Sequence, residues 1–105
     1  MSNLENKNII VTGASGGIGN SIIKKLNEAG ANILASGTKI EKLEELKKKF
    51  ENIKLLKFDI SQSDKIEEFI ENATSELGGS LDGLVNNAGI TQDNLAYCEN
   101  NIFIF

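Results

Sequence analysis

The chain lacks histidine altogether and has a single cysteine, Cys98, among its 105 residues. Without histidine, one thiol leaves too few ligands for a structural zinc site, so no metal site is expected. The lone cysteine also excludes an internal disulfide and fits a reducing compartment. These absences favour a cytoplasmic protein.

Long apolar runs and an excess of positive charge are missing as well. No apolar stretch approaches the roughly 20 residues that a membrane-spanning helix needs. Residues 1–6 have neither the basic region nor the apolar core of a signal peptide. Asp and Glu outnumber Lys and Arg by 15 to 11, and no basic face dominates. We therefore expect one small domain with neither a nucleic-acid nor a membrane partner.

Apolar segments of two kinds alternate along the chain. Apolar residues at three-and-four spacing predict half-buried helices, the first with Ile18, Ile22 and Ile23 on its inner face and an end at Gly30. A cap at Ser63 and Asp64 is expected to begin the third. The predicted strands are residues 8–11, 32–36, 53–58 and 81–86, and the predicted helices are residues 17–29, 39–50 and 64–77.

This alternation predicts the class of fold. Strands joined by helices imply right-handed crossovers and a parallel sheet. A doubly wound α/β sheet with strand order 3-2-1-4 places its ligand crevice at the carboxyl ends of strands 1 and 4, where the winding reverses. Residues 12–19 and 86–89 follow these two strands, so both segments are expected at the crevice.

The segment Thr-Gly-Ala-Ser-Gly-Gly-Ile-Gly at residues 12–19 stands between the first strand and the first helix. Its spacing, G-x-x-x-G-x-G, differs from both G-x-G-x-x-G and the phosphate-loop pattern. Glycine lets backbone N–H groups approach an anion, and the next helix points its positive end at the same place. We predict that a dinucleotide pyrophosphate binds there; a glycine-rich turn without a ligand is the alternative.

The end of the second strand bears on the choice of cofactor. Residues 36–39, Ser-Gly-Thr-Lys, contain no carboxylate to bind a ribose 2′-hydroxyl and repel a phosphate. Thr38 and Lys39 instead offer a donor and a positive charge, which predicts NADP(H); the alternative is an ordinary turn with Thr38 as helix cap. Asp59 and Ile60 end the third strand near the expected adenine, although Asp59 alone fits a turn former.

The segments at residues 12–19, 59–60 and 86–89, at these separations, resemble the short-chain dehydrogenase/reductase family. The resemblance extends from about residue 7 to residue 96. Residues 89–95 are similar to one branch, the 3-oxoacyl-[acyl-carrier-protein] reductases of fatty acid biosynthesis. Gln92 and Gly16 depart from the pattern, since that branch more often has Arg or Lys at the first position and many NADP-dependent members have Arg at the second.

The resemblance implies a Rossmann-type fold and a set of cofactor contacts. The glycine loop would line the pyrophosphate and its ribose, Thr38 the adenosine ribose and its phosphate, and residues 59–60 the adenine. Residues 87–89 would lie beside the nicotinamide ribose, and Asn86 would fix the fourth strand to its neighbours. The implied cofactor-binding residues are Gly13, Ser15, Gly16, Gly17, Ile18, Gly19, Thr38, Asp59, Ile60, Asn87, Ala88 and Gly89.

The family's catalytic residues have no counterpart in the chain. The family reduces a ketone by hydride transfer, using a tyrosine, a lysine four residues later and a serine. Here the one tyrosine, Tyr97, lies eight residues after Gly89 and is followed four residues later by Asn101. The resemblance therefore implies the cofactor-binding part of an NADPH-dependent 3-oxoacyl-[acyl-carrier-protein] reductase, without catalytic residues.

The last nine residues differ from the family pattern and end in Ile-Phe-Ile-Phe. We expect an NADP-binding half-domain over residues 1–96 and a tail outside the family over residues 97–105. In this interpretation a shifted or shortened reading frame near Ala96 truncates the fold after the fourth strand. That strand would become an exposed apolar edge, from which marginal stability or self-association would follow.

Two other functions stay open. In the first alternative, the chain is a nucleotide-binding fragment without turnover. In the second, it derives from a family member that acts on a sugar or a hydroxy acid. The partners that the resemblance implies are a nicotinamide dinucleotide, an acyl-carrier-protein thioester and further copies in a homo-oligomer.

Overall fold

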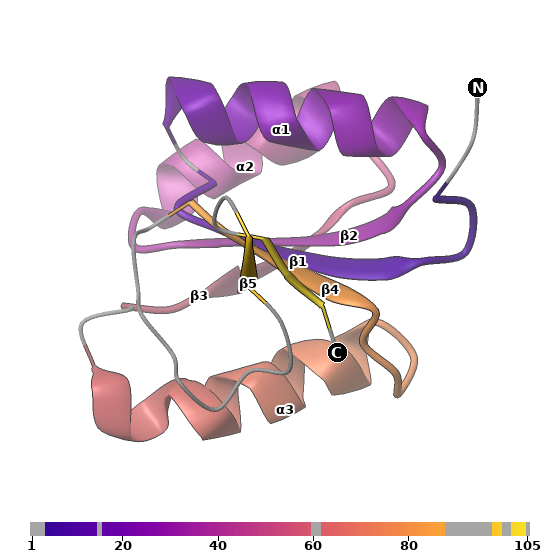
Figure 1. The fold of residues 1–105 in the computed structure, drawn as a ribbon. Helices are drawn as coiled ribbons and strands as arrows, with labels where there is room; N and C mark the ends of the chain where they lie inside the picture. Colours follow the sequence, from indigo (N-terminus) through magenta and orange to yellow (C-terminus); the bar gives the residue numbers. More distant parts are fainter. Residues whose placement is uncertain (1–3, 15, 60–61, 88–97, 100–101, 105) are drawn as a thin grey trace.

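The structure, a computed structural model, describes residues 4–14, 16–59, 62–87, 98–99 and 102–104. Figure 1 shows three layers, with α1 and α2 over one face of a sheet and α3 under the other. None of the helices within these ranges is long and apolar enough to cross a membrane. The elements are β1 (Asn8–Thr12), α1 (Gly17–Glu28), β2 (Asn32–Gly37), α2 (Ile40–Lys49), β3 (Lys54–Lys57), the 3₁₀ turn η1 (Ser63–Lys65), α3 (Ile66–Glu76), β4 (Gly83–Asn86), β5 (Cys98–Glu99) and β6 (Ile102–Ile104).

The sheet has the strand order β3-β2-β1-β4-β6-β5. Parallel pairing joins β1 to β2, with Ile9 opposite Ile33, and joins β1 to β4, with Ile9 opposite Gly83. A third parallel pair joins β2 to β3, with Leu34 opposite Lys54. The predicted doubly wound order 3-2-1-4 is therefore confirmed. Its winding reverses between β1 and β4, which places the switch point at their carboxyl ends.

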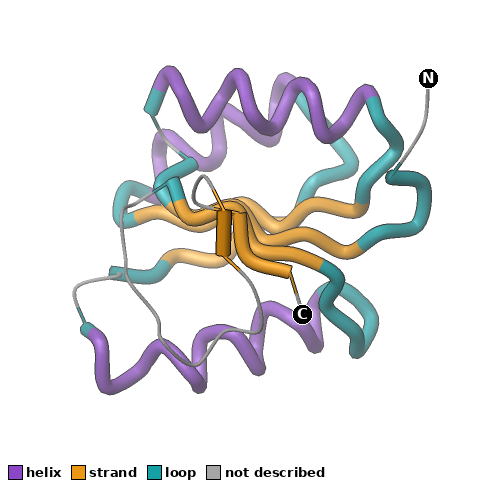
Figure 2. Tube along the Cα trace, viewed as in Figure 1, coloured by secondary structure: helices purple, strands orange, loops and turns teal. Residues whose placement is uncertain are grey.

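Two apolar cores lie on opposite faces of the sheet, which is the middle layer in Figure 2. Successive side chains of a strand point to opposite faces, so consecutive residues of β1 belong to different cores, and the same holds for β2. Phe58, just after β3, stacks on Phe69 of α3 with ring centroids 4.4 Å apart. The core under α1 and α2 includes Ile9, Val11, Ile23, Ile33, Ala35, Leu43, Leu46 and Val85, and the core above α3 includes Ile10, Leu34, Phe69, Ala73, Leu77 and Leu84.

Two local expectations are wrong. Ile18 is 71% exposed and does not face the sheet, because it lies in the first turn of α1, and the buried face of that helix begins at Gly19 and continues to Ile23. The third helix begins later than predicted and has no side-chain cap. Backbone bonds with three-residue spacing, including Lys65 N–H to the Gln62 carbonyl, form a 3₁₀ turn ahead of it.

Side-chain hydrogen bonds close the amino end of the sheet. The Asn8 amide donates to the carbonyl and the hydroxyl of Ser80 at 2.9 and 3.1 Å, and its backbone N–H donates to Oδ2 of Asp82 at 2.8 Å. Its carbonyl oxygen Oδ1 accepts from the Asn32 amide at 3.0 Å. One buried side chain at the start of β1 thus connects β2 with the segment that leads into β4.

The second edge of β4 is not exposed, which corrects the expectation from the sequence. β6 pairs with it antiparallel, with Leu84 opposite Phe103 and Val85 opposite Ile102. β5 then pairs antiparallel with β6 and becomes the outermost strand. The apolar tail supplies backbone partners to β4 from within the same chain, so the described part of the sheet has six strands, two of them drawn from the tail.

Candidate functional site

The glycine loop leaves β1 at the switch point and is held by bonds from the neighbouring strands. Gly13 has a φ of 61°, in the left-handed region where glycine carries no steric cost. Its carbonyl accepts from the Asn87 amide at 2.9 Å. On the other side, the Ala14 N–H donates to the Ser36 carbonyl in β2 at 3.0 Å. The loop is therefore fixed between the ends of β2 and β4.

The glycines of this loop have two different surroundings. A Cβ on Gly19 would lie 2.7 Å from the Gly13 carbonyl oxygen and 2.8 Å from Ala14 Cα, so only glycine lets α1 approach the loop this closely. Among the described residues, and apart from its chain neighbours and the helix's own backbone, a Cβ on Gly16 or Gly17 would meet no atom within 4 Å. The loop is thus packed tightly behind and open in front, which disfavours the interpretation of a closed turn without a ligand.

The first turn of α1 faces this open side. Its N-cap is Gly16, which makes no side-chain capping bond, and the first turn contains no acidic residue. The Asn20 amide donates to the Gly16 carbonyl at 2.9 Å, which ties the cap to the helix without using the N–H groups of the first turn. Those N–H groups have no intrahelical acceptor and carry the positive end of the helix dipole. This arrangement suits a phosphate.

The carboxyl end of β4 is joined to the carboxyl end of β1 through buried polar side chains. Thr12 lies opposite Asn86 in the register. The Thr12 hydroxyl lies 3.2 Å from Oδ1 of Asn86 and 3.4 Å from the Val85 carbonyl, within reach of both acceptors, and both side chains are buried. The predicted role of Asn86 in fixing the fourth strand agrees with this contact. Sequence reasoning missed Thr12, although a threonine at the end of an otherwise apolar strand was the signal for it.

The residues expected near the adenosine lie at the ends of β2 and β3. Thr38 and Lys39 are exposed, and α2 is capped by the backbone of Lys39 and not by the Thr38 side chain. Asp59 is exposed, and its carbonyl accepts from the Gln62 N–H at 3.0 Å in a turn. The Phe58 N–H donates to the Gly37 carbonyl at 3.0 Å, which holds these two strand ends together.

The structure thus places eight of the twelve predicted site residues. The loop and the end of β4 meet directly through Gly13 and Asn87. Thr38 and Asp59 lie at the same end of the parallel sheet, after β2 and β3. Ser15, Ile60, Ala88 and Gly89 lie outside the described residues.

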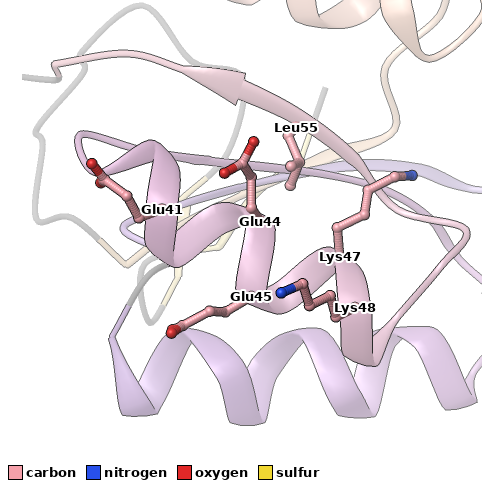
Figure 3. Close-up of a pocket in the computed structure, with 6 residues that line it drawn as sticks. All are labelled: Glu41, Glu44, Glu45, Lys47, Lys48 and Leu55. Atoms are coloured by element: carbon pink, nitrogen blue, oxygen red, sulfur yellow. The ribbon is translucent and has the colours of Figure 1, made fainter.

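A hollow of about 750 Å³ lies along α2, from Glu41 in its first turn to Lys48, with Leu55 of β3 beside it (Figure 3). Carboxylates repel a pyrophosphate, so we do not assign the cofactor to it. Within the described ranges, the hollow included, no group of three His, Cys, Asp or Glu side chains could hold a metal ion. The hollow is lined by Glu41, Glu44, Glu45, Lys47, Lys48 and Leu55.

A parallel, doubly wound sheet with a glycine loop at its switch point defines a Rossmann-type α/β protein. The family model of the short chain dehydrogenases matches residues 7–102. The chain therefore belongs to the short-chain dehydrogenase family, whose members are oxidoreductases that bind nicotinamide dinucleotide cofactors.

Several relatives are similar over most of this chain. Nodulation protein G of Rhizobium sp. (strain N33) is 42% identical over 96 residues, which are 90% of this chain and 39% of that protein. A 3-oxoacyl-[acyl-carrier-protein] reductase of Staphylococcus epidermidis is 42% identical over 95 residues, which are 86% of this chain and 38% of the reductase. The chain thus spans less than two fifths of the length of these curated relatives.

Solved structures agree with the fold. A short-chain dehydrogenase/reductase described as a glucose/ribitol dehydrogenase, from Brucella melitensis, superposes with a TM-score of 0.73 at 34% identity. That match covers 87% of this chain and 39% of the Brucella chain. A short chain dehydrogenase from Mycobacterium smegmatis gives a TM-score of 0.78 at 26% identity, covering 86% and 40% of the two chains.

Proposed function

We propose that this chain binds NADP(H) at the carboxyl end of its sheet and forms the cofactor-binding part of a 3-oxoacyl-[acyl-carrier-protein] reductase. One observation carries the binding proposal. The loop is open where Gly16 and Gly17 face outward and closed where Gly19 contacts the backbone of Gly13 and Ala14. A pyrophosphate needs this combination of free N–H groups and unobstructed space.

Residues of the chain would hold the two ends of the cofactor. Gly16, Gly17 and the first turn of α1 bind the pyrophosphate, and the exposed Ile18 covers it from the open side. Thr38 and Asp59 hold the adenosine end. Asn87 sets the position of the loop through the Gly13 carbonyl, 2.9 Å from its amide nitrogen. The nicotinamide supplies the hydride when it is bound.

The preference for NADP(H) rests on the end of β2. No carboxylate stands in residues 36–39, and Lys39 is exposed directly beyond Thr38. Glu41, the nearest carboxylate in sequence on α2, lines the hollow along this helix, together with Glu44 and Lys48 (Figure 3). A 2′-phosphate at Thr38 would therefore meet the positive charge of Lys39.

We expect NADPH to bind more tightly than NADH, and Lys39→Ala to reduce that difference about tenfold, which corresponds to about 1.4 kcal/mol. Titration followed by the fluorescence of the reduced nicotinamide measures both affinities. Lys42→Ala removes another exposed lysine, one turn further along α2, and should leave the ratio unchanged. Tighter binding of NADH to the native chain would contradict the preference.

The substrate part of the proposal is supported by the Staphylococcus epidermidis reductase, 42% identical to this chain. We expect no oxidation of NADPH when the 105-residue chain is mixed with acetoacetyl thioester, because Tyr97 has no lysine four residues later. Absorbance of NADPH measures this. Turnover by the chain alone would show that proton transfer uses other residues.

A second candidate is a dehydrogenase of sugars or hydroxy acids. It is favoured by the Brucella melitensis protein described as a glucose/ribitol dehydrogenase. An assay of a longer polypeptide distinguishes the two candidates. It joins this chain to the downstream coding sequence, in a reading frame that continues into a Tyr-x-x-x-Lys segment. The joined polypeptide is expected to reduce acetoacetyl thioester with NADPH, and oxidation of ribitol in its place would favour the second candidate.

A further inference from the structure

The C-terminal hairpin, defined as the paired strands β5 (Cys98–Glu99) and β6 (Ile102–Ile104), runs beside β4, and its strand β6 pairs with β4 in the direction opposite to the other strands. β1, β2, β3 and β4 all run parallel, whereas β6 is antiparallel to β4. Three residue pairs join β6 to β4, and two join β5 to β6. β6 therefore pairs with three of the four residues of β4, from Gly83 to Val85, on the edge opposite β1.

Without the hairpin, the outer edge of β4 would be prone to pair with a strand of another chain. All four of its residues are buried. Leu84 belongs to the core above α3 and Val85 to the core under α1 and α2, so both faces of the strand are apolar. An unpaired strand of this kind offers a row of N–H and C=O groups to any second chain. A second copy of β4 fits this edge, because it brings the same apolar alternation.

We infer that the C-terminal hairpin is an intramolecular edge cap that prevents a second copy of this chain from pairing with β4. The strand that it presents outward, β5, has only two residues and includes Glu99. Short edge strands and charges both discourage further pairing. The opposite edge of the sheet follows the same rule, since β3 has exposed lysines, Lys54 and Lys57, at its two ends.

The cap changes the expectation of self-association. The 105-residue chain is expected to be a monomer, and association through β4 is expected only when the hairpin is displaced. This inference is independent of the cofactor, so failure to bind NADPH would not affect it.

A disulfide across the β4–β6 pair tests the register directly. Val85 and Ile102 are directly opposite, and opposite residues of an antiparallel pair lie within disulfide reach. With Cys98→Ser in place, Val85→Cys plus Ile102→Cys should oxidise to a bond within one chain, seen as a monomer with no free thiol. Val85→Cys plus Phe103→Cys is the matched control, because neighbouring residues of a strand point to opposite faces and should not bridge.

The outcomes separate the cis cap from its alternatives. A dimer band on a non-reducing gel with the Val85–Ile102 pair would mean that the hairpin pairs with another copy, and equal bridging by both cysteine pairs would mean that no register is fixed. Either result would overturn the inference.

Sedimentation tests the consequence for association. Phe103→Pro removes a backbone N–H and cannot continue a strand opposite Leu84, so the apparent mass should rise with concentration above that of the monomer. Phe103→Val keeps a strand-forming residue and should remain a monomer. Circular dichroism checks that the helices persist, and the disulfide test does not depend on this variant. A Phe103→Pro chain that stays folded and monomeric at all concentrations would refute the cap.

Discussion

Replacing Gly19 with alanine is expected to lower the affinity for NADPH by more than about tenfold and the free energy of unfolding by up to about 2 kcal/mol. The new Cβ would lie 2.7 Å from the Gly13 carbonyl oxygen and 2.8 Å from Ala14 Cα. Both contacts are backbone atoms, which cannot rotate away as a flexible side chain could. The loop must therefore move, and its N–H groups would move with it.

Two opposing terms set the size of the stability change. Overpacking costs about 1–3 kcal/mol, whereas alanine is about 1 kcal/mol more favourable than glycine inside a helix. Because the clash involves backbone on both sides, we expect the overpacking term to win. Denaturant unfolding measures the stability, and NADPH fluorescence measures the affinity.

Two variants of the same helix serve as controls. A Cβ on Gly17 meets no other described part of the chain within 4 Å outside its own helix backbone, so Gly17→Ala should keep or raise stability while its methyl group obstructs the proposed phosphate and weakens binding. Ser21→Ala, on the exposed side of α1, should change neither quantity. A Gly17→Ala chain that binds NADPH as tightly as the native chain would place the phosphate elsewhere.

Replacing Leu34 with alanine is expected to cost about 2–5 kcal/mol of the free energy of unfolding. Leu34 is fully buried in β2, between β1 and β3, and belongs to the core above α3. The total free energy of unfolding of a chain of this size is about 5–15 kcal/mol, so the substitution would remove a large share of it. The folded fraction should keep its affinity for NADPH, because the side chain faces α3 and the glycine loop leads into α1.

Ile40→Ala is the matched control for this loss. Ile40 is 37% exposed at the start of α2, whereas Leu34 is fully buried, so the truncation of Ile40 removes less buried surface and should cost about 1–2 kcal/mol, less than that of Leu34. Equal losses from Leu34→Ala and Ile40→Ala in denaturant unfolding would contradict the assignment of Leu34 to the core.

The strand order and the location of the crevice could be predicted from the sequence because they depend on local pattern. Short continuous apolar runs such as Ile9 to Val11, bounded by turn residues, favour a strand buried on both faces, and each helix between two such runs implies a crossover. The glycine loop and Asn87 both follow strands, so their meeting is a consequence of parallel pairing. The hydrogen bond from the Asn87 amide to the Gly13 carbonyl joins these two segments directly.

The misjudged features depend on where one element ends relative to another. Ile18 has helical spacing to Ile22, but the spacing does not tell that the buried face of α1 begins only at Gly19. The contact of Thr12 with Asn86 needs the register of β1 against β4. The tail has strand-forming residues, yet local propensity names neither a partner strand nor a direction, so its pairing with β4 was missed.

The two ends of the sheet differ in how they are closed. At the amino end, Asn8 links Asn32, Ser80 and Asp82 through side-chain bonds remote from the glycine loop. Fluctuations at the carboxyl end therefore need not separate the strands, because the side-chain hydrogen bonds at the amino end hold them together. Amide protons beside these hydrogen bonds should exchange slowly with deuterium. The carboxyl end of the sheet can then fluctuate around a bound nucleotide while the strand topology stays intact.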